Sequence, residues 1–396
     1  MADISHFRLQ LIVFALVSAS FTNIYITQPV LPVLRDEFAT DMVLVSFTVS
    51  AVVLGIALSN LPFGFLADKL PIHPIILTGG ILVALGGLVC AMTKDLWILI
   101  TARFFQGLFI PALTTCLAAY LAKVLPAERL NVVMGSYVSA TVFGGLGGRL
   151  IGGWIHPPLH WRYAFVSASI LILISTFTAF RWLPHTSIEN KRQHITISYW
   201  ELLKRGELLL IYFCATGSFL IFSSVFNYLP FRMTAPPFNF STELTTLLYL
   251  VYIVGIFMGP TAGEASNRFG SGNTLLGGTA VLGVSLTLIL LPSTTAVVLA
   301  LLGICAGFFT IHAAAVGSLN RKLSSGQGRA NALYVLFYYM GGWIGITLSG
   351  FAYKQGGWSA VIYICLFFLV IPLSAGIGER KSNSLYSSRG RKNFLR

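Results

Sequence analysis

Twelve stretches of mostly apolar residues, each about as long as a helix that crosses a bilayer, constrain the fold of this chain most strongly. The sequence of 396 residues is 56% hydrophobic and only 10% charged, which is more apolar surface than one soluble core can bury. We therefore expect an all-α membrane protein with twelve transmembrane helices. The stretches lie near residues 10–34, 42–66, 74–93, 96–122, 131–155, 162–183, 207–231, 244–265, 273–292, 295–319, 330–352 and 358–378.

Other architectures and enzyme classes find little support in the sequence. A membrane β-barrel would need short alternating segments, and runs such as ILILISTFTAF do not alternate. The five cysteines all lie in apolar runs, which favours small core residues over disulfides or metal ligands. The sequence has no Walker A loop, zinc spacing or hydrolase elbow. We expect no enzyme activity, no cofactor and no metal.

The net charge of +13 is distributed unevenly along the chain. With twelve spans and both termini inside, 19 lysines and arginines fall in inner segments and only five in outer loops. This bias follows the positive-inside rule, so the charge reports topology and attraction to anionic lipid headgroups rather than nucleic-acid binding. We expect a monomer in the bacterial inner membrane, with a retained first span and both termini in the cytoplasm.

A polar stretch divides the spans into two sets of six. We predict a six-helix bundle over residues 1–184, a cytoplasmic linker over 185–206, a second bundle over 207–379 and a basic tail over 380–396. Landmark residues recur about 200 positions apart, which indicates two parallel repeats. The pairs are Pro32 with Pro230, Gly64 with Gly263, Lys69 with Arg268, Gly107 with Gly307, Gly144 with Gly341, Gly148 with Gly345, and Trp161 with Trp358.

The loop after the second span carries Gly64-Phe-Leu-Ala-Asp68-Lys69. This segment resembles the G-x-L-[GA]-D-[RK] loop of the major facilitator superfamily, although the continuation of that motif is absent. The second repeat holds an altered copy with Asn267 and Arg268. The resemblance implies that Gly64, Asp68, Lys69, Asn267 and Arg268 form a conformational switch; the alternative is an ordinary polar turn.

The fourth span contains Arg103-Phe-Phe-Gln106, which resembles the R-x-x-Q-G motif of the proton-antiporter branch of that family. A charge inside a span costs about 2.5–3.5 kcal/mol, so Arg103 needs a partner, a watery cavity or a route for snorkelling to the outer interface. Arg149, in the outer part of its own span, either forms one basic site with Arg103 or snorkels as well.

The fifth span resembles the glycine motif of the same branch, with Arg149 in place of its proline. Its glycine stripe predicts close helix packing, and we expect the eighth span, with Gly255, Gly259 and Gly263, to be the partner. The glycines expected in helix packing are Gly144, Gly148, Gly152, Gly341 and Gly345.

The first, tenth and eleventh spans resemble a bacterial subgroup of the family, the YnfM-like or arabinose-efflux-like exporters. His312, well inside a span, is a candidate for proton transfer, and the alternative is a neutral hydrogen-bonded histidine. Asp36 and Glu37 are peripheral candidates for the same role. The residues expected to contact substrate are Asn23, Gln28, Arg103, Gln106, Arg149 and Asn227.

These features predict a secondary transporter that works by alternating access and exports a small organic solute in exchange for protons. Because the spans hold arginines and no central acid, neutral or anionic substrates are favoured. One alternative is proton-coupled uptake of an anionic metabolite or siderophore-like compound. A non-transporting membrane sensor is a more distant alternative.

Overall fold

The computed structural model describes residues 6–184, 197–323 and 325–381, and within them the chain is helical with no strand. The expectation of an all-α protein is therefore confirmed. The first twelve residues of the predicted linker and most of the predicted tail lie outside the described residues. The division of the chain into two bundles of six spans remains a prediction.

The described residues pack into two compact units. The first takes in residues up to 184 together with 226–250, and the second takes in 197–225 together with residues from 251 on. The first half of the chain forms the helices α1 (His6–Tyr25), η1 (Gln28–Val30), α2 (Leu31–Glu37), α3 (Met42–Lys69), α4 (Ile72–Met92), α5 (Leu96–Leu113), α6 (Thr115–Val124), α7 (Ala127–Ile155) and α8 (Arg162–Trp182).

The second half of the chain begins with a short helix that carries a capping box, in which Ser198 and Glu201 bond each other's backbone N–H groups. Its helices are α9 (Tyr199–Lys204), α10 (Gly206–Thr234), α11 (Thr242–Leu247), η2 (Leu248–Ile253), α12 (Val254–Phe269), α13 (Ser271–Leu288), α14 (Thr294–Arg321) and α15 (Gln327–Phe368). Helix continues after α15 to residue 381.

Nine helical segments of the described residues are long and apolar enough to cross a membrane. One of them, Gln327–Lys381, has 55 residues and contains two helices that meet at Gly356 and Gly357, where the backbone is not helical. Counting these two separately, and adding α7 and α13, gives the twelve helices expected from the sequence. Large apolar side chains such as Phe367 (71% exposed) and Val284 (69%) lie on the surface, as lipid-facing residues do.

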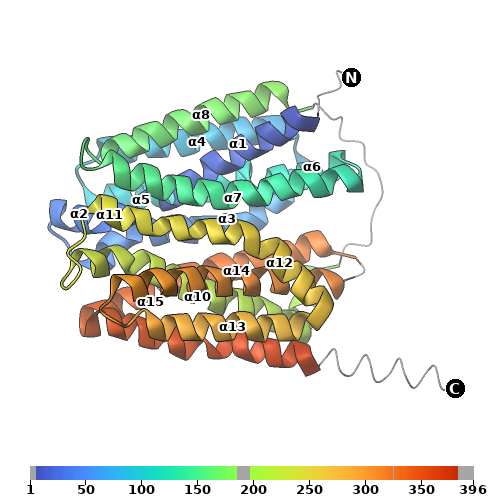
Figure 1. Ribbon diagram of the computed structural model, residues 1–396. Helices are drawn as coiled ribbons and strands as arrows, with labels where there is room; N and C mark the ends of the chain where they lie inside the picture. The colour runs from blue at the N-terminus through green and yellow to red at the C-terminus, as the bar shows by residue number, and fades with distance from the viewer. Residues whose placement is uncertain (1–5, 185–196, 324, 382–396) are drawn as a thin grey trace. The chain divides into compact units, whose positions relative to one another are not determined.

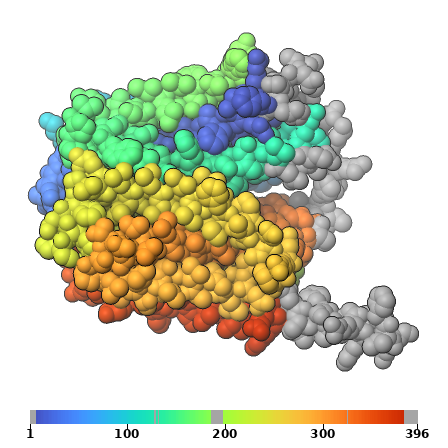
Figure 2. Space-filling view, in the orientation of Figure 1, coloured from blue at the N-terminus to red at the C-terminus, as the bar shows by residue number. Residues whose placement is uncertain are grey.

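The glycines of α7 let its backbone meet that of α1. A Cβ at Gly144 or Gly148 would lie within 2.3 Å of the backbone oxygen of Ser18 or Thr22 in α1, and one at Gly152 would lie as close to that of Ile26, directly after α1. The hydroxyl of Ser18 donates to the carbonyl of Ala140 across this contact. In Figures 1 and 2, α1 (blue) lies in the strip between α8 and α7.

The second unit repeats this contact with different residues. A Cβ at Gly341 or Gly345 of α15 would lie 2.2 or 2.4 Å from the carbonyl oxygens of Thr216 and Leu220 in α10. The hydroxyl of Thr216 donates to the carbonyl of Phe337, as Ser18 does to Ala140. Each unit thus contains one pair of helices that pack backbone against backbone at glycines.

The expected partner of the α7 glycines was wrong. At Gly255 of α12 a Cβ would meet the ring of Phe309, a residue of its own unit. The glycines of α7 instead contact α1, because small residues allow approach only where the facing helix offers backbone at the same spacing. Ser18, Thr22 and Ile26 provide that spacing of four residues.

Candidate functional site

The helix of the first span is interrupted after Tyr25, between the predicted substrate residues Asn23 and Gln28. Helix α1 ends at Tyr25, and the short helices η1 and α2 follow it. Pro29 and Pro32 lack the N–H groups that would bond the carbonyls of Tyr25 and Gln28 in a continuous helix. The carbonyl groups in the last turn of α1 therefore need partners from outside the helix.

Arg103 of α5 supplies those partners. Its Nη1 and Nη2 atoms donate to the carbonyls of Asn23 and Ile24, each at 2.6 Å. Its Nε donates to the carbonyl of Thr48 in α3 at 2.9 Å. The side chain is fully buried, which excludes snorkelling. A positive charge at a helix C-terminus also interacts favourably with the helix dipole, so Arg103 acts as a C-terminal cap for α1.

Gln106 completes this arrangement one turn along α5. Its side-chain oxygen accepts from Arg103 Nη1 at 2.7 Å, and its Nε2 donates to the carbonyl of Val83 in α4 at 2.9 Å. A longer contact of 3.5 Å joins Nε2 to Oδ1 of Asn23. Asn23 itself donates to the carbonyl of Ala19. The Arg103 and Gln106 side chains thus join three helices around the break.

Arg149 approaches the same break from α7. Its Nε donates to the side-chain oxygen of Gln28, and its Nη1 donates to the carbonyl of Gly145, both at 2.6 Å. The guanidinium lies 4.0 Å from the ring centroid of Tyr25 and 5.4 Å from that of Tyr249. The side chain is 2% exposed, so it too is buried rather than snorkelling. Aromatic faces stabilise a buried cation without neutralising it.

Five of the six predicted substrate residues therefore surround the break in the first span. The sixth, Asn227 toward the C-terminal end of α10, is buried in the same unit and donates to the hydroxyl of Ser46 at 3.1 Å. Arg103 has its three donor atoms directed at four protein oxygens, which suits a structural role better than capture of an anion. The guanidinium of Arg149 lies over two aromatic rings.

The loop after α3 holds the predicted switch residues of the first repeat. Oδ1 of Asp68 lies 2.8 Å from Nζ of Lys123 in α6, and Lys123 also donates to the carbonyl of Ala67. Lys69 lies 4.2 Å above the ring of Phe65. A Cβ at Gly64 would meet nothing within 4 Å. The aspartate is thus paired within its own repeat.

The second copy of the motif differs in its contacts. Arg268 lies 5.1 Å from the ring centroid of Phe269, the residue that ends α12. Gly270 follows with φ of 83°, a conformation that favours glycine. Asn267 stands where the first copy has an aspartate, so the second copy has no carboxylate at this position to pair with a lysine.

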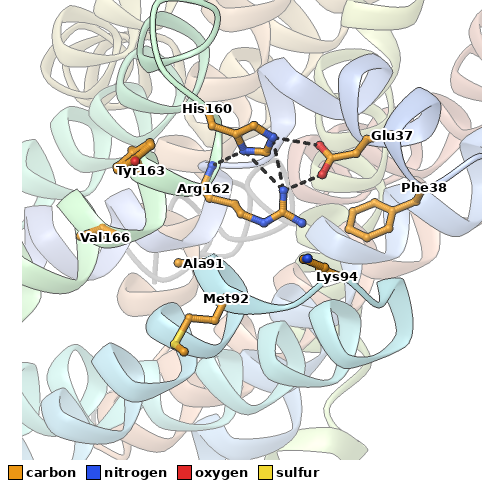
Figure 3. A pocket seen from close by; sticks show the side chains of 9 residues that line it. All are labelled: Glu37, Phe38, Ala91, Met92, Lys94, His160, Arg162, Tyr163 and Val166. Carbon is orange, nitrogen blue, oxygen red and sulfur yellow. Dashed lines mark hydrogen bonds and ion pairs between the residues drawn. The ribbon is translucent and has the colours of Figure 1, made fainter.

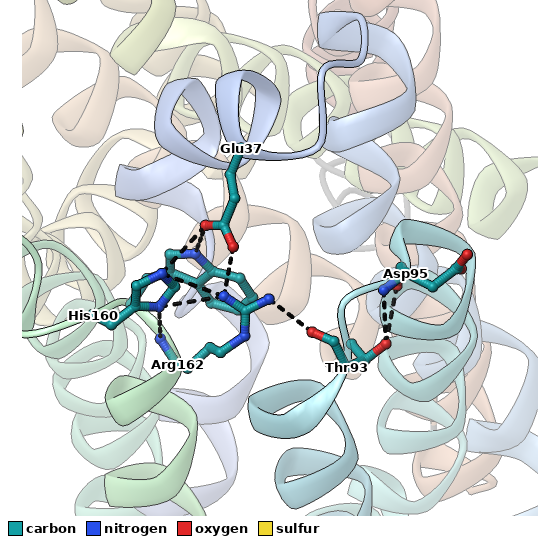
Figure 4. A network of polar contacts seen from close by, with 6 residues as sticks. Glu37, Thr93, Asp95, His160 and Arg162 are labelled. Carbon is teal, nitrogen blue, oxygen red and sulfur yellow. Dashed lines mark hydrogen bonds and ion pairs between the residues drawn. The ribbon is translucent and has the colours of Figure 1, made fainter.

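The peripheral acids lie in ion pairs at the end of the first span. Asp36 pairs with Arg35 at 2.7 Å and is well exposed. Glu37 accepts hydrogen bonds from Trp161 and from Arg162, whose Nη1 lies 2.5 Å from Oε1. His160 lies 3.5 Å from the same carboxylate. Figures 3 and 4 show His160 and Arg162 directed at Glu37.

Arg162 connects this cluster to the loop before α5, because its Nη2 donates to the carbonyl of Thr93 at 2.8 Å. The cluster lines one side of a cavity of about 680 Å³, together with Met92, Tyr163 and Lys94. Thr93 and Asp95 bond each other in the same loop (Figure 4). These contacts tie three connecting segments of the first unit together.

His312 lies in the interior of α14, where its Nδ1 is 3.0 Å from the hydroxyl of Tyr334 in α15. Aromatic rings surround it. The sequence indicates His312 as a candidate but does not indicate these aromatic rings, because phenylalanine and tyrosine are common throughout an apolar chain. Their convergence depends on the packing of three helices.

Sequence reasoning also missed a buried acid. Glu379 is 3% exposed, accepts a hydrogen bond from Ser318 at 2.6 Å and lies 3.2 Å from Nζ of Lys322. Lys322 also pairs with Glu207, which in turn pairs with Arg205. Glu379 lies at a span end next to Arg380, and nothing in that local pattern indicates burial. Among the described side chains, Arg103, Arg149 and Glu379 are the charged groups other than histidine that are buried.

Comparison with known proteins agrees with this architecture. The sequence profile of the Major Facilitator Superfamily matches residues 13–318 and 238–375. The inner membrane transport protein YnfM of Escherichia coli (strain K12) is 29% identical over 378 residues, which cover 93% of this chain and 89% of YnfM. The uncharacterized MFS-type transporter YybF of Bacillus subtilis (strain 168) is 26% identical over 384 residues, which cover 91% of each chain.

Solved structures share the fold at lower identity. A bacterial homolog of the human lysosomal transporter Spinster, in an inward-facing and occupied conformation, has a TM-score of 0.75 at 14% identity over 94% of this chain and 96% of that one. The human organic anion transporter MFSD10 (TETRAN) has a TM-score of 0.73 at 14% identity over 94% of this chain and 100% of that one.

The profile and the relatives cover nearly the whole chain, and the relatives are named as transporters rather than enzymes. The chain therefore belongs to the major facilitator superfamily, as a multi-pass membrane transporter.

Proposed function

We propose that the chain is a secondary active transporter that exports a small organic solute across the bacterial inner membrane in exchange for protons. The family supports transport, and the name of YnfM supports an inner-membrane location. The sequence contains no phosphate-binding loop for ATP, which favours an ion gradient as the energy source.

The buried charge of the first unit carries the proposal for the substrate. Arg149 is almost completely buried, and its guanidinium lies over the rings of Tyr25 and Tyr249. A cationic solute near this guanidinium would be repelled, whereas an anionic or neutral solute would not. We therefore propose a neutral or anionic substrate, with Arg149 and Gln28 as contact residues. Uptake of an anionic metabolite is the alternative that the same observation favours.

The candidates for proton coupling differ in their surroundings. Asp36 and Glu37 are held in ion pairs at the end of the first span. His312 is held by one tyrosine hydroxyl in the interior of a span. Because His312 is the candidate in the interior of a span, and its ring nitrogens can bind and release a proton, we propose His312 as the group that carries the proton.

Flux in proteoliposomes tests this function. Vesicles containing the purified chain are loaded with a pH-sensitive dye, a pH gradient is imposed, and candidate solutes are added one at a time. We expect a transported solute to dissipate the gradient and to accumulate against its own concentration. Solute movement that is indifferent to the pH gradient would contradict proton coupling, and accumulation on the side opposite to that expected for export would favour uptake.

A further inference from the structure

Aromatic side chains from three helices of the second unit meet around His312. We call them the aromatic cluster. They come from α10, α14 and α15, and each lies within 6.3 Å of another ring of the set. The cluster consists of Phe219, Phe222, Phe308, His312, Tyr334 and Tyr338.

The rings are stacked rather than merely adjacent. Tyr338 lies on Phe219 with centroids 3.8 Å apart and ring planes 12° apart. Phe222 lies on Phe308 at 4.0 Å and 21°, and His312 continues that stack at 6.0 Å and 19°. Parallel planes at such distances form surfaces that accept a further flat ring.

Burial is uneven across the cluster. Phe219, Phe222, Phe308 and Tyr334 are each less than 5% exposed, so other protein atoms cover them. His312 and Tyr338 are only half-buried, and their ring centroids are 5.3 Å apart. Of the six rings, His312 and Tyr338 are therefore the two with accessible surface.

One of these two half-buried side chains, His312, also offers a polar atom. Nδ1 of His312 is occupied by the hydroxyl of Tyr334 at 3.0 Å. The other ring nitrogen, Nε2, has no hydrogen-bond partner among the described residues, and it is not one of the enclosed polar atoms. Because Nε2 is a donor in one tautomer and an acceptor in the other, it suits a neutral or acidic polar group.

We infer that the aromatic cluster binds the transported compound, and that this compound is a flat aromatic molecule bearing a neutral or acidic polar group. The inference depends on the proposed function and narrows its substrate class. The ring of the compound stacks beside Tyr338, and its polar group bonds Nε2 of His312. The cluster contains no carboxylate, so a cation gains no counter-ion there.

Binding of a matched pair of probes tests the inference on the purified full chain in detergent. The first probe is 2-naphthoate, and the second is its saturated counterpart decahydro-2-naphthoate, which has the same charge and a similar size but no aromatic face. Isothermal titration calorimetry gives both affinities. We expect 2-naphthoate to bind at least about tenfold more tightly, the equivalent of about 1.4 kcal/mol. Equal affinities would overturn the inference.

Variants then locate the binding. Tyr338→Leu removes the open ring, and we expect it to weaken naphthoate binding at least about fivefold, whereas Tyr338→Phe keeps the ring and should bind within about threefold of the parent. Phe367→Leu is the matched control, because that ring is 71% exposed and outside the cluster. Thermal unfolding of each variant identifies misfolded protein. A folded Tyr338→Leu variant that binds naphthoate as tightly as the parent would place the aromatic site elsewhere and reject the cluster.

The same vesicles distinguish this inference from the proposed function. Proton-driven flux of a non-aromatic solute, with no binding of 2-naphthoate, would reject the aromatic site and leave the transport function intact. Selective binding of 2-naphthoate that depends on Tyr338, with no flux of any solute under a pH gradient, would support the site and contradict proton coupling.

Discussion

Arg103 reaches from α5 to the carbonyl of Asn23 in α1, and its Nη1 lies 2.6 Å from that oxygen. A charge inside a span is costly, but the Arg103 guanidinium caps the C-terminal end of α1, where the first span is broken. A lysine has one nitrogen, and it cannot reach the carbonyls of Ile24 and Thr48 as well.

We therefore predict that Arg103→Lys lowers the stability of the protein by about 2–5 kcal/mol, because buried carbonyls and a buried charge lose hydrogen bonds. Thermal unfolding in detergent measures the effect. Arg35→Lys is the control, since Arg35 is partly exposed and its ion pair is with the neighbouring Asp36. An unchanged unfolding temperature with lost solute binding would assign Arg103 to the substrate instead.

The glycines of α7 allow a test with adjacent positions. We predict that Gly148→Ala destabilises the protein by about 1–3 kcal/mol, because the new methyl group would lie 2.2 Å from the carbonyl oxygen of Thr22. At Gly147 the nearest atom is the Thr22 hydroxyl at 3.7 Å, an ordinary contact. Gly147→Ala should therefore have the stability of the parent or slightly more. Equal unfolding temperatures for the two variants would mean that α1 and α7 separate readily.

Asp68 offers a test of the switch. We predict that Asp68→Asn changes stability by less than about 1 kcal/mol, because its pair with Lys123 is exposed, but alters transport by shifting the balance of conformations. Accessibility of introduced cysteines to probes on each side of the membrane measures that balance. Lys123→Gln should produce the same shift, and the double variant should add nothing. If neither accessibility nor flux changes in Asp68→Asn, the switch role does not apply to this chain.

His312 separates binding from coupling. His312→Gln keeps hydrogen-bonding capacity but cannot titrate. We predict that the variant still binds 2-naphthoate within about tenfold of the parent, while an imposed pH gradient no longer drives flux. Calorimetry and vesicle flux on the same preparation give the two values. Gradient-driven flux at the parental rate would return His312 to a purely structural role.

The topology expected from the charge distribution is also testable. A reporter that works in the cytoplasm should be active when fused after Gly206 or after the last residue, and a reporter that works in the periplasm should be inactive there. The reason is that 19 of the cations outside the spans lie in segments assigned to the cytoplasmic side. A reporter fused at Lys94, in a predicted outer loop, is the matched control. Activity of a periplasmic reporter after Gly206 would reverse the assignment.

Much of the fold follows from the sequence because the signals are long. Stretches of about 20 apolar residues predict helices well, and the seven landmark pairs predict a repeat. The structure adds that the repeat preserves a contact, since Ser18 and Thr216 occupy equivalent places in the two units.

The sequence could not identify the partners of a side chain when those partners lie far away along the chain. Arg103 is bonded by residues 55 to 80 positions away, and no local pattern encodes that. The same holds for the burial of Glu379, which depends on Ser318 and Lys322. The aromatic cluster was overlooked because its members are separated by as many as 119 positions, from Phe219 to Tyr338.

The contact between α1 and α7 has a mechanical consequence. Backbone meets backbone at Gly144, Gly148 and Gly152, so hardly any side chain lies between the helices that could change its rotamer. The two helices can neither slide nor roll without steric overlap, and α10 and α15 are locked in the same way. We therefore expect each pair to move as one rigid body during a transport cycle. Bending should occur in segments that have helix breaks or side-chain packing.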